Sequence, residues 1–385
     1  MDIYFTEEQE MIREVAREIA AEKIKPVAAE YDESGEFPHD LMKVIADADL
    51  FRVYIDEKYG GMGLGTLALA IAIEELTWGC AGISIGYAAT GLGAFPIILH
   101  GSEEQKEKYL PPIADGTKLA AFGLTESGAG SDASAVKTTA VRDGDQYILN
   151  GTKQWITNGG EAEIYSIIAS TNPAKGARGL SAFVVEKGTE GFDFGKKEDK
   201  LGIRASATRE LIFKDCRIPA ENLIGKEGRG FKVAMDTFDA SRSGIGAQAV
   251  GIAQAALDCA VDFAYDREQF GQKITSFQGV RFMIADMATN IEAARALVYK
   301  AAFMYDAGDK QSGTFSSMAK LFASDTAMNV TVDAVQIFGG NGYMKEYPAE
   351  KLMRDAKITQ IYEGTNQIQR DIIGKDVVKH IVRKR

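Results

Sequence analysis

The pattern of apolar and polar positions along the chain changes twice, at about residues 118 and 225. Before the first change, and again after the second, apolar residues recur at the three- and four-residue intervals of amphipathic helices. Between the two changes, short runs rich in β-branched and aromatic residues alternate with turn dipeptides, which is typical of strands. We therefore expect an N-terminal helical domain over residues 1–118, a middle β domain over 119–225 and a C-terminal helical bundle over 226–385.

Helix signals are clear in the first block. Ser102 with Gln105 has the pattern of a capping box, and the pair Pro111-Pro112 is expected to stop the helix that begins there. The segment "LGTLALAIAIEELTW" (64–78) is apolar on all sides. Such a pattern predicts a buried helix.

Four short runs in the middle block predict strands: "AVRDGDQYILNGTKQWITNG" (140–159), "YSIIAS" (165–170), "LSAFVVEK" (180–187) and "ATRELIFKDCRIP" (207–219). The dipeptides at 143–144, 150–151 and 158–159 are Asp-Gly or Asn-Gly pairs, which favour tight turns. No helix-length pattern separates the runs. The block therefore predicts a small antiparallel sheet or barrel without βαβ units.

Long helical segments return at 228–265, 276–308 and 312–338. Helices of this length exceed what a small globule needs, so the pattern favours a four-helix bundle with oligomeric packing.

Composition narrows the classes of function. The 385 residues carry a formal charge of −11, which argues against bulk binding to nucleic acid or anionic membranes. The three cysteines and three histidines lack metal-ligand spacing, so we expect no metal site and look for a catalytic acid or base among the carboxylates. No run reaches the roughly 18 uninterrupted apolar residues of a membrane span. The start lacks signal- or transit-peptide character, so we expect a cytoplasmic protein, or a mitochondrial matrix protein if the chain is a processed eukaryotic one.

The segment "FGLTESGAGSDAS" (122–134) contains Gly128-x-Gly130-x-x-Ala133, which superficially matches a dinucleotide-binding fingerprint. That fingerprint needs a helix opening at the glycines, whereas strand-like residues follow here. Two interpretations remain: a loop whose N–H groups and hydroxyls bind a ligand, or an ordinary turn-rich loop.

Two pairs of residues are candidates on spacing alone. Trp155 and Thr157 share one face of a strand, where they could flank a planar heterocycle or simply belong to the core. Asp239 and Arg242 lie one helical turn apart, as an exposed ion pair or as contacts to an anionic ligand.

Glycines interrupt or end the last helices at three places: "DREQFGQ" (266–272), "QIFGGNGY" (336–343) and "IYEGTNQIQR" (361–370). Glycine costs about 1 kcal/mol in a helix interior, so close approach of a ligand or backbone is one explanation and helix capping is another. The third segment places Glu363 before Gly364 in otherwise helical sequence. Glu363 is either a reactive carboxylate or a solvated charge at a helix boundary.

Taken together, "LTESGAGSD", "WITN", "DREQFGQ", "QIFGGNGY" and "IYEGTNQIQR" occur in the order and spacing found in acyl-CoA dehydrogenases. The chain resembles that family over its whole length, and most closely its short-chain, butyryl-CoA dehydrogenase-like branch. The resemblance implies FAD as cofactor, an acyl-CoA substrate, electron-transferring flavoprotein as partner, and a homotetramer built as a dimer of dimers.

The resemblance also implies roles for individual residues. Those expected to line the flavin and the start of the CoA channel are Phe122, Leu124, Thr125, Ser131, Trp155 and Thr157. Those expected to hold the rest of FAD, partly across a subunit interface, are Arg267, Phe270, Gln278, Gln336, Gly339, Gly340, Thr365 and Gln367. Those expected to contact the substrate are Ser131, Asp239, Arg242, Tyr362, Gly364 and Thr90.

By the same resemblance, Glu363 removes the α-proton of the thioester while the β-hydrogen passes to flavin N5 as hydride, giving a 2-enoyl-CoA. Some members carry the base one residue before the arginine of the Asp-x-x-Arg motif. Ser241 occupies that position here and cannot act as base, so Glu363 is the expected base.

Small residues crowd the segment expected to line the acyl pocket, "GISIGYAATGLGAFP" (82–96): Gly86, Ala88, Ala89, Gly91 and Gly93. They either permit close helix packing or leave width for a branched or alicyclic acyl group, with Thr90 as a polar wall. Two other functions stay open: an acyl-CoA oxidase-like enzyme that uses oxygen, and a non-catalytic CoA- or flavin-binding protein.

Overall fold

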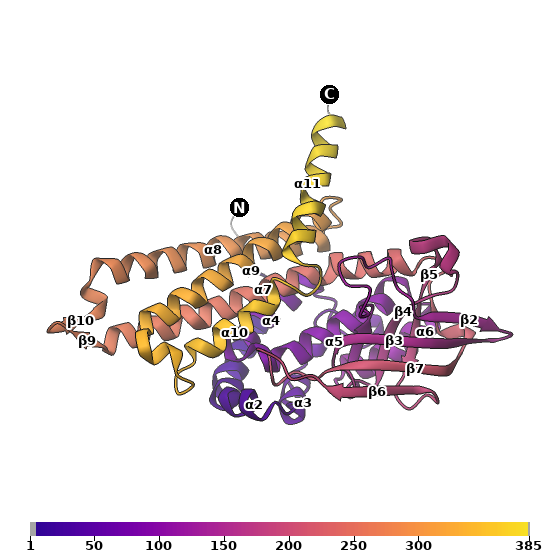
Figure 1. Ribbon diagram of the computed structural model, residues 1–385, viewed down its shortest axis with the longest axis horizontal. Coiled ribbons are helices and arrows are strands. Elements are labelled where there is room, and N and C mark those ends of the chain that lie inside the picture. The colour runs from indigo at the N-terminus through magenta and orange to yellow at the C-terminus, as the bar shows by residue number, and fades with distance from the viewer. Residues whose placement is uncertain (1–4, 384–385) are drawn as a thin grey trace.

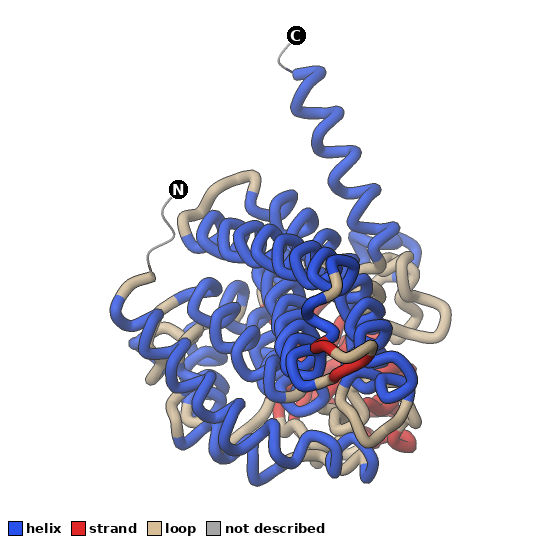
Figure 2. Tube along the Cα trace, turned by 90° about the vertical axis from the view of Figure 1, so that its left-hand side faces the viewer, coloured by secondary structure: helices blue, strands red, loops and turns tan. Residues whose placement is uncertain are grey.

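The computed structural model describes residues 5–383, and within them the chain forms helices, then a sheet, then helices (Figure 1). The sheet lies at one end of the molecule, the long helices extend away from it, and α11 projects from the bundle (Figures 1 and 2). The predicted fold class is therefore confirmed. Residues 1–4 and 384–385, the outermost ends of the predicted domains, lie outside the described part.

From residue 5 onward, the N-terminal block contains the α-helices α1 (Glu7–Ile19), α2 (Ala28–Ser34), α3 (His39–Asp47), α4 (Gly65–Gly79), α5 (Ala81–His100) and α6 (Glu103–Ala114). As predicted, α4 is buried on nearly all sides. Its two buried carboxylates are paired: Glu74 accepts hydrogen bonds from Arg295 Nε at 2.7 Å and Tyr299 Oη at 2.8 Å, and Glu75 pairs with Arg17. Buried charges remain tolerable only when paired in this way.

The predicted stop of α6 at Pro111-Pro112 is wrong. Ser102 does begin the helix with a capping box, but the helix runs through both prolines to Ala114. Each proline removes one backbone donor, and this close to the helix end the loss does not prevent the last turn from forming.

Eight strands form one sheet: β1 (Ala120–Gly123), β2 (Thr139–Asp143), β3 (Gln146–Thr157), β4 (Ile164–Ser170), β5 (Leu180–Glu186), β6 (Phe192–Lys197), β7 (Thr208–Pro219) and β8 (Leu223–Ile224). Their order is β6-β7-β3-β2-β4-β5-β8, with β1 beside β4. The sheet is mixed rather than antiparallel, because β4 pairs in parallel with both β1 and β2.

Two of the three predicted turns are confirmed. Asp143-Gly144 closes the β2–β3 hairpin, and Asn158-Gly159 follows the end of β3. The turn predicted at Asn150-Gly151 is wrong, because β3 continues through it with a register shift. Gly151 has a φ of 145°, and a Cβ there would lie 2.5 Å from Thr138 Oγ1, so the glycine allows a bulge and a close strand contact.

The C-terminal block contains α7 (Gly230–Asp266), α8 (Gln278–Asp306), α9 (Ser312–Phe338), α10 (Ala349–Thr359) and α11 (Asn366–Arg383). The short hairpin of β9 (Glu268–Gln269) and β10 (Gln272–Lys273) joins α7 to α8. Helices α7 to α10 pack on one another as the predicted bundle. By length and composition α5 and α7 could each cross a membrane, but both are mostly buried within the protein, as core helices are.

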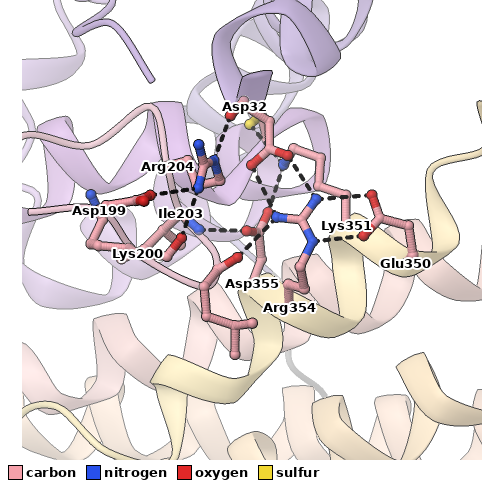
Figure 3. Close-up of polar contacts among 11 residues, drawn as sticks. Asp32, Asp199, Lys200, Ile203, Arg204, Glu350, Lys351, Arg354 and Asp355 are labelled. Carbon is pink, nitrogen blue, oxygen red and sulfur yellow. Dashed lines mark hydrogen bonds and ion pairs between the residues drawn. The ribbon is translucent and has the colours of Figure 1, made fainter. Parts of the chain in front are cut away.

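A polar network ties α10 to the other two domains (Figure 3). Arg354 donates to Asp32 of α2 at 2.7 Å, to Glu350 at 2.6 Å and to the carbonyl of Leu201 at 3.0 Å. The neighbouring Asp355, fully buried, accepts the backbone N–H of Ile203 at 2.5 Å. All three domains therefore fix the position of α10, the helix that leads to Glu363.

Candidate active site

A cavity of about 350 Å³ lies where the three domains meet. Its walls come from α4, α5, β1, the loop after β1, β3, α7, and residues 362–364 with the start of α11. Of the residues singled out in the sequence, the cavity brings together Phe122, Leu124, Thr125, Ser131, Trp155, Thr157, Arg242, Tyr362, Glu363 and Gly364.

Glu363 stands in the joint between α10 and α11, defined here as residues 360–365. Both Glu363 and Gly364 have positive φ, 51° and 90°, so the helical path is broken at this dipeptide. Ser241 Oγ, on α7, donates a hydrogen bond to Glu363 Oε2 at 2.7 Å. The serine at the alternative base position thus contacts the carboxylate.

Burial raises the pKa of Glu363 to about 7, although the Ser241 hydrogen bond and the cations of Arg242 and Lys320 lower it. A carboxyl group with this pKa is a stronger base than an ordinary glutamate and is substantially ionised at neutral pH. Glu363 is therefore suited to removing a weakly acidic proton.

Arg242 is buried at the same wall. Its Nη1 donates to Asp239 at 3.1 Å, but its buried Nε has no hydrogen-bond partner within residues 5–383. An unpartnered buried donor is costly, so the site has capacity for a further acceptor. Asp239 lies behind Arg242 and does not itself line the cavity.

The glycine-serine loop is fixed from beneath by a buried ion pair that the sequence analysis missed. Lys153 Nζ donates to Glu126 Oε1 at 2.7 Å and to the Leu124 carbonyl at 3.0 Å. Glu126 also accepts the backbone N–H groups of Lys137 and Thr138 at 2.7 and 3.0 Å. A strand precedes this loop and no helix follows it, so the rejection of a dinucleotide fingerprint is confirmed.

Trp155 is 56% exposed and has a φ of 59°, at a register shift of β3. It is therefore not a core residue, and the bulge breaks the simple alternation on which its pairing with Thr157 was predicted. Both residues nevertheless line the cavity. An exposed indole at a polar rim provides a flat surface for a planar ring.

The deep part of the cavity is apolar. Its walls include Leu69, Ile73, Ile85, Ala88, Ala89, Leu92, Phe95 and Ile245. Of the two interpretations of the glycines in α5, close packing fits: none of the three lines the cavity, a Cβ on Gly86 would contact Met42, one on Gly91 would contact Leu69, and one on Gly93 would lie 2.4 Å from Ala121 N.

The prediction of Thr90 as a polar wall is wrong. The side chain is fully buried behind the wall, where its hydroxyl donates to the Gly86 carbonyl at 2.9 Å and accepts from Asn158 at 3.2 Å.

A second set of predicted cofactor residues lies far from this cavity, at the end of the bundle away from the sheet (Figure 1). All are exposed, and Phe270 is 93% exposed: Arg267, Phe270, Gln278, Gln336, Gly339 and Gly340. Thr365 is the last residue of the joint, and Gln367 lies in the first turn of α11. One copy of the chain therefore does not bring the two sets together.

Comparison with known proteins identifies the class. Family profiles described as the N-terminal, middle and C-terminal domains of acyl-CoA dehydrogenase match residues 6–117, 121–216 and 228–378. The short-chain-specific acyl-CoA dehydrogenase of Clostridium acetobutylicum is 48% identical, with 98% of this chain and 100% of that protein covered.

Two solved structures are similar over nearly the whole chain. Butyryl-CoA dehydrogenase from Megasphaera elsdenii superimposes with a TM-score of 0.96 at 48% identity, covering 98% of this chain and 100% of that one. A chain from the structure of the electron transferring flavoprotein of Acidaminococcus fermentans, concerned with flavin-based electron bifurcation, gives a TM-score of 0.96 at 53% identity, covering 98% and 99%.

The fold is thus that of oxidoreductases that act on acyl-CoA. The chain belongs to the acyl-CoA dehydrogenase family, whose members are FAD-dependent enzymes. The residues present fit a flavin: an exposed indole, the hydroxyl of Thr157 and a glycine loop with open space beside Gly128 and Gly130 border one cavity.

Proposed function

We propose that the protein dehydrogenates a short, branched or alicyclic acyl-CoA to the 2-enoyl-CoA, with Glu363 as the base. The observation that carries this proposal is the Glu363 carboxylate, with a pKa of about 7, at the wall of an apolar cavity. A proton α to a thioester is weakly acidic, and a base tuned near neutral pH removes it most effectively.

Protein groups prepare the proton transfer. Ser241 orients one carboxylate oxygen of Glu363 through its 2.7 Å hydrogen bond. The backbone N–H of Glu363 has no acceptor within residues 5–383, so it is available to donate to a thioester oxygen and stabilise the developing enolate. Gly364 leaves room for the thioester. Trp155, Thr157 and the glycine loop would hold the ring of a bound FAD, which would supply the hydride acceptor for the β-hydrogen.

The acyl end of the substrate would occupy the apolar part of the cavity. Ala88 and Ala89 are the small residues that face it, and they supply width between larger neighbours such as Leu92 and Phe95. We therefore expect butyryl-, isobutyryl- and cyclohexanecarboxyl-CoA to be better substrates than long straight-chain acyl-CoAs. A strong preference for long chains would contradict this part of the proposal.

Subunit assembly and the electron acceptor follow from separate arguments. The exposed residues that are predicted to bind FAD at the bundle end need a second copy to reach a cavity, which supports the pairing of two copies within the homotetramer that the family resemblance implies. The 53% identity to a chain from a study of an electron transferring flavoprotein supports that protein as the acceptor. Reduction of electron-transferring flavoprotein, compared with oxygen consumption, separates this assignment from the oxidase-like alternative.

The experiment that tests the base is Glu363→Gln, which keeps the shape but removes the basic oxygen. We expect the variant to retain FAD and acyl-CoA binding while kcat falls by roughly 1,000-fold, within the range for loss of a general base. Glu190→Gln, at an exposed glutamate of the β domain, is the matched control and should keep wild-type kcat. A Glu363→Gln enzyme with near-normal turnover would refute the mechanism.

A further inference from the structure

Lys320, in the middle of α9, is fully buried directly beneath the joint that carries Glu363. Its Nζ donates hydrogen bonds to the carbonyl of Gly364 at 2.8 Å and to Oδ1 of Asn366 at 2.9 Å. An ammonium group is costly to bury, so a lysine that is kept here needs a compensating interaction. Both of its acceptors belong to the segment that begins at Glu363.

Gln369, also fully buried, contacts the joint through the same carbonyl group. Its Nε2 donates to the carbonyls of Glu363 at 3.1 Å and Gly364 at 3.0 Å. The Gly364 oxygen therefore accepts two donors, one from α9 and one from α11, which matches its two lone pairs. The Gly364–Thr365 peptide is therefore held from two directions, and Gln369 also holds the carbonyl of the Glu363–Gly364 peptide before it.

Asn366 completes the support. Its Nδ2 donates to Ser324 Oγ at 2.9 Å and to Asp325 Oδ1 at 2.7 Å, both on α9. The first residue of α11 is thus attached to two turns of α9 through Lys320, Ser324 and Asp325.

This support explains how Glu363 keeps an unusual backbone conformation. A non-glycine residue at φ 51° is strained, at a cost on the order of 1 kcal/mol, and persists only when its surroundings determine it. In the same geometry the Glu363 side chain reaches Ser241 and the cavity. The contacts from α9 fix the backbone of the joint, and the hydrogen bond from Ser241 fixes the carboxylate.

Resting on the assignment of Glu363 as base, we propose that Lys320 is a positioning residue for the reaction: it holds the Gly364 carbonyl so that the Glu363 carboxylate faces the substrate, and its positive charge favours the ionised carboxylate. A purely structural lysine would hold the carbonyl but would not affect ionisation of the carboxylate. The effect of the charge on ionisation can be detected in a pH profile.

The charged groups around the pair define the expected direction. Glu363 faces Arg242 on α7 and Lys320 on α9, and both cations lower its pKa. Lys320 faces Glu363, Arg242 and Asp325, while burial lowers the Lys320 pKa to about 7. Removing the Lys320 cation raises the pKa of Glu363, so the base becomes ionised only at higher pH.

The test uses the FAD-loaded enzyme and three variants. Lys320→Met removes both the contact and the charge. Lys320→Arg keeps the charge but cannot place one nitrogen between both acceptors. Gln369→Met removes the second donor without changing any charge. Lys310→Met, at an exposed lysine before α9, is the charge-matched control.

Two quantities are measured: the pH dependence of kcat/KM, and the rate at which solvent deuterium enters the α-position of the acyl-CoA, which reports proton removal separately from passage of electrons to the acceptor. For Lys320→Met we expect the acid limb of the profile to move to higher pH by about half a unit or more and the exchange rate at pH 7 to fall about tenfold or more. Lys320→Arg and Gln369→Met should slow exchange while leaving the limb in place.

The proposal is overturned if Lys320→Met keeps both the acid limb of the wild-type pH profile and the wild-type exchange rate. If that variant does not fold, the outcome rests on Lys320→Arg and Gln369→Met, and wild-type exchange in both would overturn it equally. If Glu363 is not the base, the Glu363→Gln enzyme will be active, and this result distinguishes failure of the base assignment from failure of the Lys320 proposal. An inactive Glu363→Gln enzyme beside an unaffected Lys320→Met enzyme would refute only the role of Lys320.

Discussion

Glu363 combines two features that oppose each other at the level of a single residue. Burial raises its pKa, which strengthens it as a base, while Ser241, Arg242 and Lys320 favour the ionised form that can accept a proton. Neither effect alone gives a useful base: full desolvation would leave the group protonated, and full pairing would leave it weakly basic. The value of about 7 results from their balance.

The pH dependence of activity follows from this balance. Because only ionised Glu363 accepts a proton, kcat/KM should rise as pH increases through about 7. Ser241→Ala removes a hydrogen bond that stabilises the ionised form of Glu363, so the acid limb of the kcat/KM profile should move to higher pH. Ser243→Ala, on the same helix but away from the cavity wall, should leave it unchanged. A Ser241→Ala profile identical to wild type would show that the bond does not tune the base.

The glycine after the base is equally specific. Gly364 has a φ of 90°, and an added Cβ would lie 2.6 Å from Gln369 Nε2. Gly364→Ala should therefore displace the joint, lower kcat about tenfold or more and destabilise the protein by on the order of 1 kcal/mol or more. Gly374→Ala, in α11 with open space around it, is the control, expected to retain activity. Steady-state rates and thermal unfolding of both variants decide the matter.

The sequence predicted Glu363-Gly364 as a non-helical joint, but it did not predict the lysines beneath the site. Lys153 and Lys320 are both fully buried, yet each stands in a segment whose pattern gives no sign of it. A lysine in a strand or helix is normally solvent-exposed, and only its tertiary partners reveal the exception. For Lys320 the nearest signal is its place near small residues in "SMAKLFAS" (317–324), which indicates a tightly packed helix face without indicating a charge partner.

At the scale of elements, α5 approaches the sheet more closely than a helix with ordinary side chains could. Gly93 faces β1 so closely that a Cβ would lie 2.4 Å from the Ala121 nitrogen. Two residues earlier on the same helix, Gly91 faces Leu69 and a Cβ would lie at an ordinary 3.5 Å. Gly93 therefore sets the spacing between α5 and β1, whereas Gly91 does not.

This difference predicts opposite results for two similar substitutions. Gly93→Ala should force α5 away from β1 and destabilise the protein by about 1–3 kcal/mol, as overpacking does. Gly91→Ala adds a methyl group at van der Waals distance within a helix, so stability should be unchanged or slightly higher. Denaturant titration of both variants measures the difference. Equal stability of the two would mean that α5 is not packed against β1 as described.

The elements that the sequence misjudged share a cause. The predicted Asn150-Gly151 turn rested on a local preference, whereas the glycine is there to allow contact with Thr138 across the sheet. Strand β4 pairs in parallel with β1, which lies about 40 residues earlier in the chain. The pattern of apolar residues in either segment does not indicate which strand it pairs with. Helix periodicity, capping boxes and buried apolar runs are local and were predicted well; long-range pairing was not.

At the scale of the whole molecule, the exposed set of predicted cofactor residues lies at the end of the bundle away from the sheet (Figure 1), whereas the other set borders the cavity where the three domains meet. At the exposed end of the bundle, Phe270 is almost fully exposed, and Gly339 and Gly340 have open space around them. Contact with a second copy of the chain would explain this exposure. If two copies exchange these ends, each cavity is completed by the other copy's bundle.

Reciprocal exchange predicts that two inactive variants restore each other. Glu363→Gln inactivates its own cavity but keeps an intact bundle end, whereas Arg267→Glu keeps the cavity but places a negative charge where the FAD pyrophosphate is expected. In a mixed pair, one site combines the intact cavity with the intact bundle end. Random pairing in equal amounts then gives roughly a quarter of wild-type activity, because half of the pairs are mixed and each has one working site.

Co-expression with two different affinity tags isolates assemblies that contain both variants, whose activity should be about half that of wild type for single pairs and about 0.29 of it for randomly formed dimers of dimers. Each variant expressed alone, and the two mixed after assembly without subunit exchange, serve as inactive controls. Purified mixed pairs without activity would mean that each copy completes its own site, which would require the bundle end and the cavity of one chain to approach each other. The position of α10 argues against such a movement, because Arg354 and Asp355 bind it to both other domains (Figure 3).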